Sequence, residues 1–131
     1  MPLPVSIAGT AFSDQNYDHR PIKSSAGNFY LILLDSTNKG LIEAWKASDP
    51  TASFSEQDAV DKPSRPSAVN TLEVYQVGDV IHILTQETSF SIITYHQFNM
   101  ATDNWDIVSS AVETPAESPD QVFRAVTLVV R

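Results

Sequence analysis

The sequence predicts an all-β domain built from two copies of a four-stranded antiparallel sheet. Two observations predict this class. Apolar runs and turn residues repeat at an offset of 51 residues, from Gly27 to Gly78, and no stretch shows the apolar spacing of an amphipathic helix. A chain of 131 residues is expected to form a single domain, 1–131. The expected segments are a first repeat at about 20–63, a second at about 70–115 and a terminal strand at about 122–131.

The first two strands of each repeat are predicted to form a hairpin. Gly27-Asn28 and Gly78-Asp79 are dipeptides that close two-residue turns, because glycine adopts positive φ without steric cost. The second strands are almost continuous apolar runs, as expected of central strands that are buried on both faces. The predicted first and second strands are 21–25 and 29–35 in one repeat, and 71–77 and 80–86 in the other.

The third and fourth strands complete each predicted sheet. Tyr95 and Gln97 should lie on the opposite face from His96 and Phe98, because side chains alternate along a strand. At the common offset, Trp45 is aligned with His96. The predicted third and fourth strands are 41–47 and 53–60, then 91–99 and 104–112, with lone strands at 5–8 and 123–130.

A four-stranded antiparallel unit of about 50 residues has the size of a propeller blade. Two complete blades with flanking strands are too few to close a ring, since the smallest propellers have about four blades. We therefore expect either assembly with other chains or closure as a β-sandwich or open barrel. Lone terminal strands favour self-association, or pairing with other subunits, by strand addition.

Composition and charge restrict the function classes. Eight Lys and Arg against sixteen Asp and Glu give a net charge of −8, which disfavours nucleic acid and membrane partners. We expect no signal peptide or transmembrane segment, because Met1 to Thr10 lacks a basic start and the apolar runs are short. The chain has no cysteine, so its localisation stays open, with virion and extracellular settings both considered.

The segment from Tyr95 to Trp105 (YHQFNMATDNW) resembles the Asp-box-type repeats of sialidase-like β-propellers. The resemblance implies that an acid-containing turn and a tryptophan lock the hairpin between the third and fourth strands. It also implies that three arginines hold a substrate carboxylate, and the candidates near the first strands are Arg20, Arg65 and Arg124. The family's nucleophile is a tyrosine paired with a glutamate. No such pair can be placed by spacing here, so we expect a protein that is not an enzyme.

Other chemistry has less support in the sequence. Asp103 and Asp106 are expected to bond the backbone of their own turn rather than to act as paired catalytic carboxylates. The three histidines lack the spacing of metal ligands. We therefore predict no metal site, no cofactor and no catalytic residue.

Large aromatic side chains are candidates for stacking on sugar rings, with core packing as the alternative for the same residues. The candidate ligand-binding residues are Trp45, Tyr95, His96, Arg20 and Arg124. We expect a non-catalytic structural or binding module of a larger assembly, such as a virion or surface structure. The alternatives are a carbohydrate-binding, lectin-like protein and part of a sialidase-like glycoside hydrolase.

Overall fold

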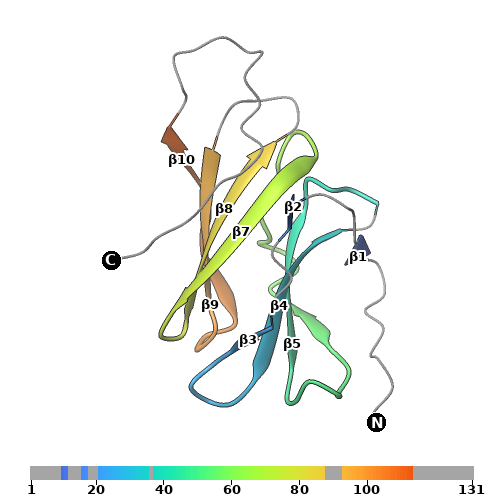
Figure 1. Ribbon diagram of the computed structural model, residues 1–131, viewed down its shortest axis with the longest axis vertical. Helices are drawn as coiled ribbons and strands as arrows, with labels where there is room; N and C mark the ends of the chain where they lie inside the picture. The colour runs from blue at the N-terminus through green and yellow to red at the C-terminus, as the bar shows by residue number, and fades with distance from the viewer. Residues whose placement is uncertain (1–9, 12–15, 18–20, 36, 88–92, 114–131) are drawn as a thin grey trace.

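The computed structural model describes residues 10–11, 16–17, 21–35, 37–87 and 93–113. These residues form ten β-strands and no helix, which confirms the predicted all-β class. Figure 1 shows the strands gathered into two open sheets that lie beside each other. The strands are β1 (Thr10–Ala11), β2 (Asn16–Tyr17), β3 (Ile22–Lys23), β4 (Phe29–Asp35), β5 (Ile42–Ala47), β6 (Ser55–Gln57), β7 (Val69–Val77), β8 (Val80–Glu87), β9 (Ile93–Asn99) and β10 (Asn104–Glu113).

The first sheet is an antiparallel meander of β4, β5 and β6, in which Leu31 lies opposite Trp45 and Trp45 opposite Glu56. The short strands β3 and β1 both pair antiparallel with β4. β3 meets the beginning of β4 and β1 meets its end, so each covers only part of that strand. All pairings in this sheet are antiparallel, as predicted.

The second sheet has the order β10-β9-β8-β7-β2. Its four long strands form an antiparallel meander, whereas β2 runs parallel to β7, with Asn16 opposite Thr71. The sequence did not predict this parallel strand. Among the described residues, β6 and β10 each pair with one neighbouring strand, so the sheets are not closed into a barrel.

The strand order within both repeats agrees with the prediction, and the central strands agree to within one or two residues. Two predicted strands are shorter in the structure. The first strand of repeat one is reduced to β3, and its fourth strand to β6, which ends where the backbone of Asp58 takes a positive φ of 48°. The lone strands predicted at 5–8 and 123–130 lie outside the described residues.

The two predicted hairpin turns have different lengths. Val77 pairs with Val80, so Gly78-Asp79 is a two-residue turn, with Gly78 at a φ of 58°, as predicted. The prediction for Gly27-Asn28 was wrong, because Lys23 pairs with Phe29 and the connection spans five residues, 24–28. Its ends are joined by a hydrogen bond from the Ser24 amide to the Asn28 carbonyl, 2.9 Å. The extra residues place Gly27 inside a longer loop, at a φ of 87°.

The hydrophobic core lies between the sheets and takes side chains from both. Alternate residues of β4 and of β8 belong to one buried cluster, together with aromatic rings from β4, β9 and β10. The Tyr30 and Phe98 ring centroids are 6.0 Å apart, and Phe98 meets Trp105 edge-to-face at 5.1 Å. The core residues are Ile22, Tyr30, Ile32, Leu34, Ile42, Ala44, Val69, Leu72, Val74, Ile81, Ile83, Phe98, Met100 and Trp105.

Asp103, in the turn between β9 and β10, ties the two sheets together. Its carboxylate accepts a hydrogen bond from the Tyr30 hydroxyl at 2.7 Å and pairs with the Lys46 ammonium at 2.6 Å. Burial and the Asp103 carboxylate raise the pKa of Tyr30, so the hydroxyl keeps its proton and donates. The expectation that Asp103 bonds its own turn was therefore wrong, because the docked first sheet offers it two stronger partners.

Candidate functional site on the outer face of the second sheet

The second sheet has one face in the core and one turned away from it, which we call the outer face. Alternation along β9 sends Tyr95, Gln97 and Asn99 to the outer face, and Thr94, His96 and Phe98 to the core. The described residues thus confirm the predicted division of this strand. An outer face with aromatic and amide side chains is the candidate site.

Strand register builds a continuous row of polar and aromatic groups across this face. Tyr75 of β7 lies opposite His82 of β8, and His82 lies opposite Gln97 of β9. Directly opposed side chains have their Cβ atoms about 5 Å apart, which is close enough for neighbouring side chains to share one ligand. Tyr75 is 41 % exposed, which leaves part of its ring open to solvent.

His82, Tyr95 and Gln97 form a directed hydrogen-bond chain. The Tyr95 hydroxyl donates to Gln97 Oε1 at 3.1 Å and lies 2.5 Å from His82 Nδ1. The Tyr95 hydroxyl has one proton, and it donates this proton to Gln97. We therefore assign His82 Nδ1 as the donor in the hydrogen bond between His82 and Tyr95. The lone pair on His82 Nε2 is then available as an acceptor. The two rings also stack, with centroids 5.9 Å apart and an interplanar angle of 26°.

Asp106 continues the chain on the β10 side. One of its carboxylate oxygens, Oδ2, accepts hydrogen bonds from Asn99 Nδ2 at 3.0 Å and from Gln97 Nε2 at 3.5 Å. The Ala101 amide donates to Asn99 Oδ1 at 3.0 Å, which fixes the orientation of the Asn99 amide. These bonds hold both amide groups in place and leave the second oxygen of the exposed Asp106 for other partners.

Burial acts on the two ring side chains in opposite directions. It lowers the pKa of His82 below its ordinary value and raises the pKa of Tyr95 above its ordinary value. Both groups are therefore uncharged at neutral pH. The outer face offers neutral donors and acceptors beside the carboxylate of Asp106, an arrangement suited to holding hydroxyl groups.

The structure separates His96 and Trp45 from Tyr95 and does not describe the two predicted arginines. His96 lies in the core at 0 % exposure, where its Nδ1 donates to the Val108 carbonyl at 2.5 Å and its Nε2 accepts from the Thr85 hydroxyl at 2.8 Å. Trp45 lies in the first sheet, on the side away from the core. Arg20 and Arg124 lie outside the described residues.

The expected equivalence of Trp45 and His96 was wrong. Superimposing the second strands at the offset of 51 places Leu31 on His82, and the register partners of these two residues are Trp45 and Gln97. The connection between the second and third strands is one residue longer in the second repeat, and one residue reverses the face of every following side chain.

Trp45 belongs to a charged cluster on the first sheet. Its indole N–H donates to Glu43 at 2.8 Å, and the Lys62 ammonium bridges Glu43 at 3.0 Å and Glu56 at 2.8 Å. Burial, the largest effect, raises the pKa of Glu43 despite the hydrogen bonds from Trp45 and Lys62. These groups bond to one another. Through the ion pair of Lys62 with Glu43, they hold the segment that follows β6 against β5.

Arg65, a candidate from the family resemblance, is partly buried and bound to other side chains of this protein. Its guanidinium meets the buried carboxylate of Glu87 at 2.7 Å and donates to the Ser109 hydroxyl at 2.8 Å. The other Glu87 oxygen accepts from the amide and the hydroxyl of Ser67. Arg65 therefore has an internal partner for its charge.

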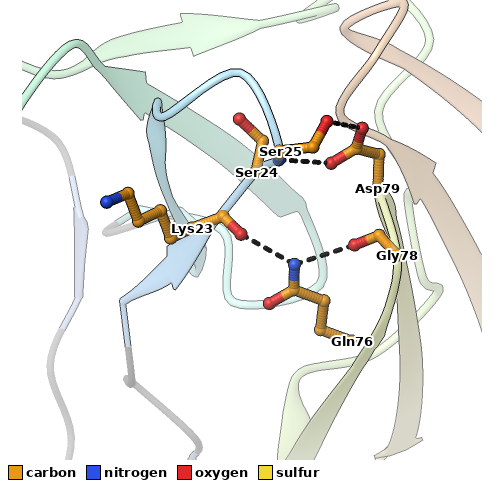
Figure 2. Close-up of a pocket in the computed structure, with 6 residues that line it drawn as sticks. All are labelled: Lys23, Ser24, Ser25, Gln76, Gly78 and Asp79. Carbon is orange, nitrogen blue, oxygen red and sulfur yellow. Dashed lines mark hydrogen bonds between the residues drawn. The ribbon is translucent and has the colours of Figure 1, made fainter.

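A shallow pocket of about 410 Å³ opens between the first hairpin turns of the two sheets. Figure 2 shows the Gln76 amide donating to the carbonyls of Lys23 and Gly78, and Ser25 bonded to the carboxylate of Asp79. The Lys23 ammonium extends away from these bonds and lies 5.5 Å from the centroid of the Phe29 ring. The polar groups that line the pocket thus bond to one another and link the two turns.

Three comparisons with known proteins identify no protein similar to this chain. No family model, curated protein or solved structure matches the chain. The described part of the chain contains no group of three or more His, Cys, Asp or Glu side chains placed to hold a metal ion. Within the same residues, no helix is long and apolar enough to cross a membrane.

The sequence prediction named Tyr95 as a candidate and did not name the other residues of the candidate site. These residues share the outer face with Tyr95: Gln97 and Asn99 on the same strand, Tyr75 on β7, His82 on β8 and Asp106 on β10. The available signal was the two-residue turn at Gly78-Asp79. That turn fixes Tyr75 opposite His82, because the loop length of a hairpin sets its register.

Proposed function

We propose that the protein is a non-catalytic module that binds carbohydrate on the outer face of the second sheet. The observation that supports this most is the hydrogen-bonded chain from His82 through Tyr95 and Gln97 to Asp106, on a half-buried sheet face beside the partly exposed ring of Tyr75. Sugars present apolar C–H surfaces and hydroxyl groups. An aromatic ring next to fixed amide and carboxylate groups complements both.

Pre-organisation supports the same proposal. The amides of Gln97 and Asn99 are already oriented by Asp106 and by the Ala101 amide, so little side-chain entropy remains to be lost on binding. The sheet itself is rigid on both sides of this row, because β8 and β9 are central strands. A rigid face of this kind needs no moving loop to form its contacts.

A glycan array with the full chain tests the proposal. We expect the wild-type protein to bind a subset of glycans, and Tyr75→Ala and Gln97→Ala to reduce the affinity at least tenfold. Val60→Ala is the matched control, since Val60 is 93 % exposed and lies on a loop of the first sheet. Unchanged urea midpoints would show that the variants fold.

Two results would overturn the proposal. One is a flat wild-type signal over the whole array. The other is a glycan affinity of Tyr75→Ala and Gln97→Ala equal to that of Val60→Ala. This result would mean that the sugar binds to another surface.

A role as a structural component of a larger assembly, such as a virion, is the second candidate. The observation that favours it is the open edge of each sheet, since β6 and β10 have a neighbour on one side only within the described residues. Exposed backbone N–H and C=O groups on an edge strand can pair with another chain. Light scattering tests this role, and a stable monomer at all concentrations would refute strand exchange between copies.

A further inference from the structure

The four long strands of the second sheet contain acidic residues but no lysine or arginine. The strands β7, β8, β9 and β10 contain no lysine or arginine, whereas they carry Glu73, Glu87, Asp106 and Glu113. Asp106 belongs to the outer face, at its β10 side. A ligand there meets the Asp106 carboxylate, and the four long strands of this sheet contribute no lysine or arginine.

The described cations are engaged elsewhere or lie outside this sheet. Lys46 pairs with Asp103, Lys62 with Glu43 and Glu56, and Arg65 with Glu87. Lys23 lies over the ring of Phe29, and Lys39 belongs to the turn between β4 and β5. None of these five residues is on a strand that forms the outer face.

We propose that the outer face takes uncharged pyranosides and rejects sugars that carry a carboxylate, with Asp106 as the residue that discriminates between them. This inference rests on the proposed function and specifies its ligand class. A sugar hydroxyl can donate to the open oxygen of Asp106 or to His82 Nε2, and can accept from the remaining N–H groups of Gln97 and Asn99. A sugar carboxylate has no proton to donate to Asp106 and adds like-charge repulsion.

The proposed ligand class differs from the one implied by the sialidase-like resemblance. That resemblance implies an acidic sugar held by arginines. In the structure, Arg65 is bound to Glu87 and Ser109 and is not on the outer face. The charge pattern of the second sheet thus favours a neutral ligand.

Pairs of sugars that differ only at C6 provide the test. Isothermal titration compares glucose oligosaccharides with glucuronic-acid oligosaccharides, and galactose with galacturonic-acid oligosaccharides, at low and high salt. We expect at least tenfold weaker binding of the acidic member at low salt. The difference should shrink at 0.5 M salt, where screening shortens the range of repulsion to about 4 Å.

Asp106→Asn removes the discriminating charge while keeping the size of the side chain. We expect this variant to narrow the neutral-to-acidic affinity ratio to about threefold or less. Asp61→Asn is the matched control, since it removes the same charge from an exposed loop position of the first sheet and should keep the full ratio.

The possible outcomes distinguish the two proposals. Equal or tighter binding of the acidic sugars would overturn this inference and leave the carbohydrate-binding function standing. An unchanged ratio in Asp106→Asn would overturn the role of Asp106. Absence of binding to either class, in agreement with a flat glycan array, would overturn the proposed function itself.

Discussion

Acid should destabilise this protein through His96, over the pH range between the ordinary pKa of histidine and the lowered pKa of His96. The imidazole is fully buried between the sheets, with one nitrogen on the Val108 carbonyl and the other on the Thr85 hydroxyl. Burial, the largest cause, together with the nearby charge of Arg65, lowers the pKa of His96 to about 4, against the opposing effects of Val108 and Glu87. In the unfolded chain the same group titrates near its ordinary value of about 6.5.

The sign of the effect follows from proton uptake. Well above pH 6.5, His96 is neutral in both the folded and the unfolded protein, so its titration does not change the free energy of unfolding. Between pH 6.5 and 4 the unfolded state binds a proton that the folded state rejects, so the free energy of unfolding falls. The two pKa values give a loss of about 2.5 kcal/mol between pH 7 and pH 4.5.

Urea unfolding at half-unit steps from pH 7.5 to 4.5, followed by tryptophan fluorescence, measures this loss. In His96→Gln the slope of stability against pH over this range should be mostly abolished, although the variant is less stable at pH 7. His82→Gln serves as the control and should keep most of the slope, because His82 is only partly buried. A His96→Gln variant with the full wild-type slope would refute the assignment of the acid sensitivity to His96.

Three further changes test the packing. Glu87→Gln should lower the free energy of unfolding by about 3 kcal/mol in urea titrations, because it leaves the guanidinium of Arg65 without its carboxylate; a loss below 0.5 kcal/mol would contradict this. Tyr30→Phe should cost about 1–2 kcal/mol by removing a buried hydroxyl bonded to Asp103, and an unchanged thermal midpoint would argue against that bond. Gly40→Ala should cost about 1–3 kcal/mol, because its Cβ would lie 2.5 Å from the Arg65 carbonyl oxygen; a stability equal to wild type, measured by calorimetry, would show that this backbone moves freely.

The strands and the division of β9 into two faces were predictable, because both depend on local patterns. The alternation of Thr94, Tyr95, His96 and Gln97 needs only the period of a β-strand. The position of Tyr75 opposite His82 needs one more step, the length of the turn at Gly78-Asp79.

The remaining features depend on residues far apart in the chain. Asp103 reaches Tyr30, 73 positions away, only because the two sheets dock, and no local pattern encodes that distance. The predicted equivalence of Trp45 and His96 was wrong for a related reason. One additional residue between the second and third strands places the following side chains on the opposite face of the sheet, although the sequence repeat is still recognisable. Sequence repeats therefore predicted the topology more reliably than the positions of individual side chains.

The bonds from Tyr30 to Met100 and Asp103, at the turn that follows β9, predict that the two repeats do not fold separately. Expressed alone, residues 21–63 would present Ile32 and Leu34 to water and would lack a partner for the Tyr30 hydroxyl. The complementary half would lose the cover over Ile83 and Phe98. We therefore expect the described strands to unfold as a single cooperative unit, so that a duplicated pattern in the chain does not give two fragments able to fold independently.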